Sequence, residues 1–212
     1  MVDHNAVINA EARKVLKPLG LVCQGKSRVW IDDHGWWTIQ VEFQPSGWTT
    51  GSYLNVGVNW LLYEGTVGAF HIGHRVDVPF IEASGNEGLK DDAHRLALSA
   101  KAEVERLRLQ FSTLKAAVSY YRENGCRSAW DDYHFGVFQA LTGEIESAGT
   151  AFRSVPTRRL EFGWEKALAQ RASELHELAS DRIHFVETIQ GIVRRTRSIG
   201  HLPDWESDIV FR

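Results

Sequence analysis

The sequence predicts an α+β protein, in which an N-terminal helix and an antiparallel β-sheet of about four to six strands are followed by a C-terminal α-helical bundle. Two patterns lead to this expectation. Apolar and polar residues alternate with a period of two between residues 36 and 62, which is typical of strands with one buried face. From about residue 88 the apolar residues recur every three or four positions, as they do in amphipathic helices.

The first predicted element is a helix over residues 3–19. Asp3 is a residue type that caps helix N-termini, and Gly20 is a residue type that ends helices. The apolar stripe of this helix consists of Val7, Ile8, Val15, Leu16 and Leu19. The helix leads directly into the sheet.

Strands are expected at residues 21–24, 28–31, 36–44 and 53–62, with further strands between residues 66 and 81. The loop of residues 32–35 contains a glycine and joins two of these strands as a hairpin. Successive side chains of a strand point to opposite faces of the sheet. The core face is therefore expected to carry Trp37, Ile39, Val41 and Phe43.

The opposite face of the sheet mixes aromatic rings with amides and charges, a composition that suits a contact surface. We expect a ligand-binding or partner-binding surface there, formed by Arg28, Trp30, Trp36, Gln40, Gln44, Tyr53, Asn55 and Asn59. The alternative is that the helical half of the chain lies over this face, so that the amides form internal hydrogen bonds.

Two long amphipathic helices are expected after the sheet, one from about residue 88 to residue 125 and one from about residue 157 to residue 197. We therefore expect residues 1–85 to form a helix-plus-sheet domain and residues 86–212 to form a helical region that packs on the sheet as one compact unit. The apolar stripe of the first long helix could alternatively be a dimer seam. Packing within the chain, and hence a monomer rather than a homodimer, is the simpler interpretation.

Residues 133–155, between the two long helices, resemble a single tetratricopeptide-like hairpin. The resemblance rests on the small and aromatic residues Gly136, Gly143, Ala148 and Phe152. Small residues let two helices approach closely, and glycine permits the turn between them. Since one repeat cannot build a peptide-binding solenoid, we interpret this segment as a tight hairpin inside the bundle.

Acidic residues precede histidines at two places, and metal hydrolases use side chains of these types. The two sets are Asp91, Asp92 and His94, and Asp131, Asp132 and His134. Both lie at predicted helix starts, where the helix dipole favours carboxylates. The sequence also lacks the Walker, GxSxG and HExxH motifs. We therefore expect no metal, no cofactor and no catalytic residue, and the alternative is a metal-assisted hydrolase or transferase with Asp and His at the sheet/helix seam.

Composition narrows the choice of compartment and partner. The formal net charge is −3, which does not favour nucleic acid or an anionic membrane as a partner. The N-terminal residues lack the apolar core of a signal peptide, and no run is long enough to span a bilayer. Cys23 and Cys126 are too few for a disulfide framework. We expect a cytoplasmic protein.

One combination of motifs resembles a known family. A helix ending in Lys17-Pro18-Leu19-Gly20 is followed by an aromatic strand with Phe43-Gln44, and then by Leu54-Asn55-Val56-Gly57-Val58 before Trp60. In this order the motifs resemble the bacterial domain of unknown function 4304, over about residues 8–120.

The resemblance implies no established activity. Gln44 and Asn55 match the recurring glutamine and asparagine of that family, and both lie on the polar face expected above. We interpret the chain as a binding or interaction protein that uses the polar aromatic sheet face or the sheet/helix seam to bind a protein or peptide partner, in an immunity-type or regulatory role.

Overall fold

The computed structural model describes residues 3–65, 70–82, 87–158, 161–205 and 210–211, and it confirms the α+β class. By their contacts the residues group into two compact units. The sheet unit comprises residues 1–59 and 68–109, and the helical unit comprises residues 60–67 and 110–212. The helix at residues 89–110 thus belongs with the sheet, although the sequence pattern grouped it with the later helices. Whether the helical region packs on the sheet as one compact unit stays a prediction.

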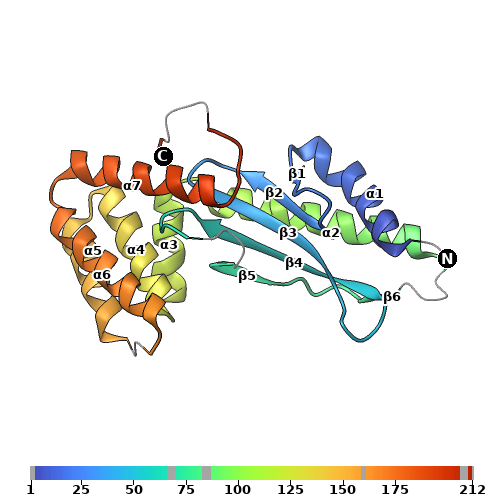
Figure 1. Ribbon diagram of the computed structural model, residues 1–212, viewed down its shortest axis with the longest axis horizontal. Helices are drawn as coiled ribbons and strands as arrows, with labels where there is room; N and C mark the ends of the chain where they lie inside the picture. The colour runs from blue at the N-terminus through green and yellow to red at the C-terminus, as the bar shows by residue number, and fades with distance from the viewer. Residues whose placement is uncertain (1–2, 66–69, 83–86, 159–160, 206–209, 212) are drawn as a thin grey trace. The chain divides into compact units, whose positions relative to one another are not determined.

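The sheet unit contains one antiparallel sheet and two long helices (Figure 1). The strands are β1 (Val22–Cys23), β2 (Val29–Asp33), β3 (Trp37–Pro45), β4 (Gly51–Trp60), β5 (Ile72–Arg75) and β6 (Ile81–Glu82). Their order in the sheet is β1-β2-β3-β4-β5, and β6 also pairs with β4. The helices are α1 (His4–Leu16), which continues into a 3-10 turn η1 (Lys17–Leu19), and α2 (Leu89–Gln110).

Helix α1 begins and ends at the residues that the sequence indicates. The Oδ1 atom of Asp3 accepts hydrogen bonds from the backbone N–H groups of Asn5, at 2.9 Å, and Ala6, at 3.3 Å. Gly20 follows η1 with a φ of 93°, a left-handed conformation that favours glycine. The predicted cap and stop are both confirmed.

Helices α1 and α2 cover one side of the sheet, which we call the inner face. Its buried side chains are Trp30, Ile39, Val41, Phe43, Leu54, Val56 and Val58. The two helices lie side by side, since His94 Nδ1 of α2 is 3.2 Å from Glu11 Oε2 of α1. Helix α2 also contacts the sheet directly, because His74 Nε2 of β5 is 3.8 Å from Glu103 Oε2. The sheet unit is thus a two-layer arrangement of sheet and helices.

An ion pair between a buried carboxylate and a half-buried arginine ties α2 to strand β2. Asp32 is 5% exposed and accepts two hydrogen bonds from Arg108, from Nε at 2.7 Å and from Nη2 at 2.8 Å. His34 Nε2 lies 2.8 Å from the same carboxylate, and Arg108 also donates to the Leu19 carbonyl at 2.7 Å. Burial alone would raise the pKa of Asp32, but the hydrogen bonds from Arg108 and His34 outweigh it, so the pKa is lowered.

The lowered pKa of Asp32 makes the stability of the sheet unit depend on pH. The unfolded chain, with an aspartate pKa of about 3.9, binds a proton at higher pH than the folded chain does. The contribution of Asp32 is therefore complete above the unfolded pKa and is lost as the pH falls through the folded pKa. Between about pH 6 and about pH 3, we expect the free energy of unfolding in urea to fall more steeply for the parent than for Asp32→Asn. Equal slopes for the two proteins would contradict this expectation.

The turn between β2 and β3 fixes a register that differs from the predicted one. The backbone N–H of His34 donates to the Trp37 carbonyl at 2.9 Å, so Gly35 and Trp36 form a two-residue turn. Gly35 has a φ of 82°, which such a turn requires at its first position. In consequence Trp30 pairs with Val41, and Ile31 pairs with Gln40. Directly paired residues share a face, so Trp30 lies on the inner face and not, as expected, on the polar one.

The helical unit has shorter helices than the sequence predicts. They are α3 (Leu114–Asn124), α4 (Ala129–Thr142), α5 (Ile145–Ser154), a 3-10 turn η2 (Val155–Thr157), α6 (Gly163–Leu178) and α7 (Arg182–Ile199). The first predicted long helix is interrupted after α2, where Thr113 Oγ1 accepts the Ala116 N–H at 3.2 Å and caps a new helix. Asp181 caps α7 in the same way, by accepting the His184 N–H at 3.2 Å. Both long helices are thus divided by a local cap.

The α4–α5 hairpin confirms the interpretation of residues 133–155. Gly143 ends α4 with a φ of 89°. A Cβ atom at Gly136 would come within 2.7 Å of the Phe152 ring, so the close approach of the two helices requires glycine there. In the part of the chain that is described, no helix is long and apolar enough to cross a membrane.

Candidate binding surface on the sheet

Five residues from three adjacent strands gather on the outer face of the sheet, the side opposite α1 and α2. This outer-face cluster consists of Glu42, Gln44, Tyr53, Asn55 and Arg75. Asn55 Nδ2 donates to Gln44 Oε1 at 3.0 Å and to Glu42 Oε2 at 3.1 Å. Arg75 Nη2 donates to the same Gln44 oxygen at 3.0 Å. The hydrogen bonds hold the amide groups in fixed orientations.

The guanidinium group of Arg75 lies over an aromatic ring. Its Cζ atom is 3.8 Å from the centroid of the Tyr53 ring, a distance at which cation–π attraction is favourable. The Tyr53 ring also contacts Phe80, with ring centroids 4.7 Å apart. Arg75 is exposed, whereas Tyr53 and Phe80 are half-buried. The cluster thus offers a cation, an aromatic ring and amide groups to a partner.

The structure brings three of the predicted residues, Gln44, Tyr53 and Asn55, together in this cluster. Gln40 and Asn59 also share a contact, in which Asn59 Nδ2 donates to Gln40 Oε1 at 3.4 Å, but both side chains are buried. For these two residues the alternative of internal hydrogen bonding describes the structure better than a contact surface does.

The remaining three predicted residues lie elsewhere. Trp30 is 2% exposed on the inner face, where the register of the β2–β3 hairpin places it. Trp36 is 5% exposed and lies in the two-residue turn, so the alternation of the strand does not apply to it. Arg28 precedes β2 and contacts α1, on the side of the inner face. The expectation that Trp36 shares an accessible surface with Tyr53 is therefore wrong.

Sequence reasoning missed Arg75 and Phe80. Both come from the segment where glycines and Pro79 interrupt the alternation, so no strand face could be assigned. The pairing of Asn55 with Arg75 across β4 and β5 places the arginine in the cluster. Within residues 72–75 the alternation places Arg75 on the same face as Gly73, but it does not say which face of the sheet that is.

An open cleft of about 950 Å³ lies beside the outer-face cluster and shares Glu42 with it. Its walls come from the start of α1, the turn between β1 and β2, and the loop of residues 46–50 between β3 and β4. Arg28, Lys26, His4 and Trp48 are among its lining residues. No sequence pattern indicates this cleft, because three separate segments form it.

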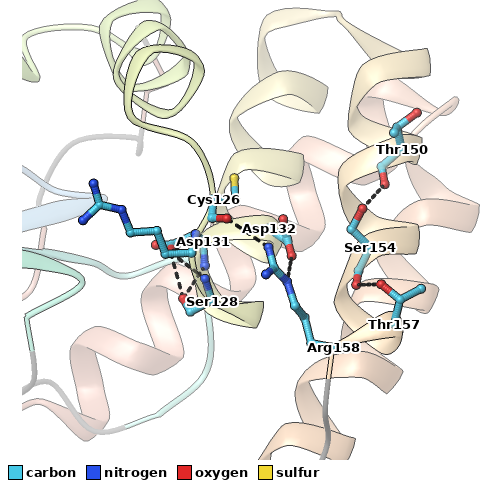
Figure 2. A network of polar contacts seen from close by, with 9 residues as sticks. Cys126, Ser128, Asp131, Asp132, Thr150, Ser154, Thr157 and Arg158 are labelled. Carbon is cyan, nitrogen blue, oxygen red and sulfur yellow. Dashed lines mark hydrogen bonds and ion pairs between the residues drawn. The ribbon is translucent and has the colours of Figure 1, made fainter.

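The acidic sets that resemble those of metal hydrolases have other partners. Arg158 donates to Asp132 Oδ2 at 2.7 Å and to the Cys126 carbonyl at 3.0 Å, as Figure 2 shows. Asp131 and Ser128 form the capping box of α4. In the first set, Asp92 pairs with Arg95, and His94 contacts Glu11 of α1. Within the described ranges, no three His, Cys, Asp or Glu side chains are arranged so that they could hold a metal ion.

The thiol of Cys126 is poorly suited to nucleophilic catalysis. Burial, followed by the charges of Asp132 and Asp131, raises the pKa of Cys126 to about 12. Burial also raises the pKa of Cys23. The nucleophilic form of cysteine is the thiolate, and a raised pKa keeps the thiol protonated near neutral pH. Cys23 and Cys126 are thus ordinary, partly buried cysteines.

Comparison with known proteins does not assign the chain to a family. No protein-family model matches the chain, and no curated protein or solved structure is significantly similar to it. The resemblance to domain of unknown function 4304 stays a prediction. The function is therefore inferred from the outer-face cluster and the cleft.

Proposed function

We propose that the chain is a binding protein that recognises a protein or peptide partner through the outer-face cluster. The observation that carries the proposal is the exposed Arg75 guanidinium, held over the Tyr53 ring and bonded to Gln44. Tyrosine and arginine are the residue types most often responsible for binding energy at protein interfaces, together with tryptophan. An immunity-type or regulatory role is part of this proposal.

The internal contacts of the cluster support binding over a purely structural role. Gln44 Oε1 accepts from both Asn55 and Arg75, so these groups are already ordered before a partner arrives. Ordering side chains in advance lowers the entropy cost of association. The free thiols of Cys23 and Cys126 are consistent with a reducing compartment, and a cytoplasmic location is part of this proposal.

The test compares partner capture by the parent with capture by Arg75→Ala and Tyr53→Ala. Each variant should lose at least about tenfold in affinity for the captured partner, which corresponds to about 1.4 kcal/mol. The matched control is Arg106→Ala, which removes an exposed arginine of the same unit that pairs with Glu103 on α2. The melting temperature of every variant should remain close to that of the parent.

The readout is direct binding of the purified partner, measured by calorimetry. Equal affinity for the parent and for both cluster variants would overturn the proposal. A loss of affinity in Arg106→Ala as large as that in Arg75→Ala would also overturn it, because the effect would then not belong to the outer face.

A further inference from the structure

The cleft beside the outer-face cluster contains an arginine whose described partners are all uncharged. Arg28 Nη1 donates to Ser52 Oγ at 2.6 Å, and Nη2 lies 3.1 Å from His4 Nδ1. Nη2 also donates to Asn5 Oδ1, and Nη1 lies 3.5 Å from the Phe43 carbonyl. These contacts hold the guanidinium group in place without neutralising it. Burial lowers the pKa of Arg28, but an arginine remains charged in proteins.

The acidic residues that line the cleft are engaged with other groups. Burial lowers the pKa of Arg28, and the charge of Asp3 offsets part of this shift. The Oδ1 atom of Asp3, however, accepts hydrogen bonds at the N-terminus of α1 and, within the described part of the chain, none from Arg28. Glu42 accepts from Asn55 in the outer-face cluster. Among the described residues, no carboxylate lies within ion-pair distance of Arg28 or of Lys26, the second cation of the cleft. The cleft lining therefore carries two positive and two negative charges, and neither cation is paired with a carboxylate of the described residues.

His4 also lines the cleft, and its ring holds Arg28 in position. Burial, and next the charge of Arg28, lowers the pKa of His4, so the ring is neutral. Since Arg28 donates to Nδ1, the proton of the ring lies on Nε2. This Nε2 is buried and has no hydrogen-bond partner in the described part of the chain, although His4 lines the cleft. Because Nδ1 faces Arg28, Nε2 lies on the other side of the ring and points away from the guanidinium group, so His4 orients Arg28 and does not bind a ligand beside it.

Trp48 adds an apolar surface to this charged cleft. It lies in the loop of residues 46–50 and is 99% exposed, more than any other large apolar side chain of the described residues. A tryptophan ring in water is a favourable contact for an apolar or aromatic group. The cleft thus combines cations with an aromatic ring.

We propose that this cleft binds an organic anion, with the carboxylate or phosphate group of the ligand at Arg28 and Lys26 and an aromatic or apolar group against Trp48. The volume of about 950 Å³ lies within the usual range for small-molecule sites. The site adjoins the partner surface centred on Arg75, with which it shares Glu42, and it does not depend on the proposed function.

The test uses five probes and follows tryptophan fluorescence and melting temperature. Phenylacetate and phenyl phosphate combine a ring with a carboxylate or a phosphate, acetate and inorganic phosphate lack the ring, and 2-phenylethanol lacks the charge. The two aromatic anions should bind saturably and at least about threefold more tightly than the bare anions, about 0.7 kcal/mol. The tighter of the two aromatic anions identifies the head group. Saturable binding of neither aromatic anion, or equal binding of 2-phenylethanol, would overturn the proposal.

Three variants locate the binding in the cleft. Arg28→Gln should abolish binding of the tighter aromatic anion, and Lys26→Gln and Trp48→Ala should each weaken it about three- to tenfold. Arg28 also links α1 to Ser52, so Arg28→Gln could lower the stability of the fold. Lys26 and Trp48 are exposed and carry the test independently of it. Arg106→Gln on α2 is the control and should bind like the parent. Unchanged binding in both Lys26→Gln and Trp48→Ala would overturn the proposal.

Discussion

Replacing Arg108 by methionine should destabilise the sheet unit by about 3 kcal/mol, the lower end of the range for breaking a buried ion pair. The change leaves the Asp32 carboxylate, which is 5% exposed, without its bidentate partner. It also removes the donor to the Leu19 carbonyl. His34 remains 2.8 Å from the Asp32 carboxylate and compensates in part for the lost hydrogen bonds. Urea unfolding at about pH 7 measures the loss.

Two further variants show whether the loss belongs to the ion pair. Asp32→Asn combined with Arg108→Met removes both charges, so the double variant should recover about 2 kcal/mol relative to Arg108→Met alone. Arg106→Met, which removes an exposed arginine of the same helix, should change stability by less than about 0.5 kcal/mol. If the double variant is less stable than Arg108→Met, the buried charge is not the cause of the loss.

The sequence was sufficient to predict the class of the fold but not the faces of its strands. Alternation identifies β3 and β4 because apolar side chains occupy one face of each strand and mostly polar ones the other, although several of those polar side chains are buried as well. It cannot relate the face of β2 to that of β3, because one residue more or less in the turn exchanges the faces. The turn was expected at residues 32–35 and is formed by Gly35 and Trp36. That shift moved Trp30 to the inner face.

The apolar pattern also fails to locate the ends of some helices. The apolar spacing of three and four continues across the break at residues 111–113, since Phe111 is itself buried. A periodic pattern therefore predicts one long helix, whereas the Thr113 cap begins a new one. At α1 the apolar stripe lies between the two capping signals, and the predicted cap Asp3 and stop Gly20 are both correct.

The sequence predicts the part of the outer-face cluster that lies on the adjacent strands β3 and β4. Gln44, Tyr53 and Asn55 come from adjacent strands, and their grouping follows from alternation. Arg75 reaches the cluster through the pairing of β5 with β4, and such a pairing is not encoded in a local pattern. The cleft is formed by three separate segments of the chain. No local sequence pattern therefore indicates that Lys26 and Trp48 line the same cleft as Arg28.

The largest single effect is expected in the helical unit, where Trp60→Ala should cost about 4 kcal/mol or more, within the range for removing a buried tryptophan. Trp60 is 2% exposed, and its ring meets Phe111 and Phe138 edge to face, with centroid distances of 5.1 Å in both cases. Its Nε1 donates to the Tyr121 hydroxyl at 3.1 Å. The substitution therefore creates a cavity and also removes a donor from a buried hydroxyl group.

Trp60→Phe separates these two causes, because phenylalanine retains much of the ring volume and lacks the N–H group. It should cost about 1–3 kcal/mol, the range for a buried polar group that loses its partner. Urea unfolding followed by circular dichroism at about 222 nm, where helices dominate the signal, measures both variants. A cost for Trp60→Ala no larger than that for Trp60→Phe would show that the surrounding helices collapse into the cavity, and that edge-to-face packing contributes little to the stability of this unit.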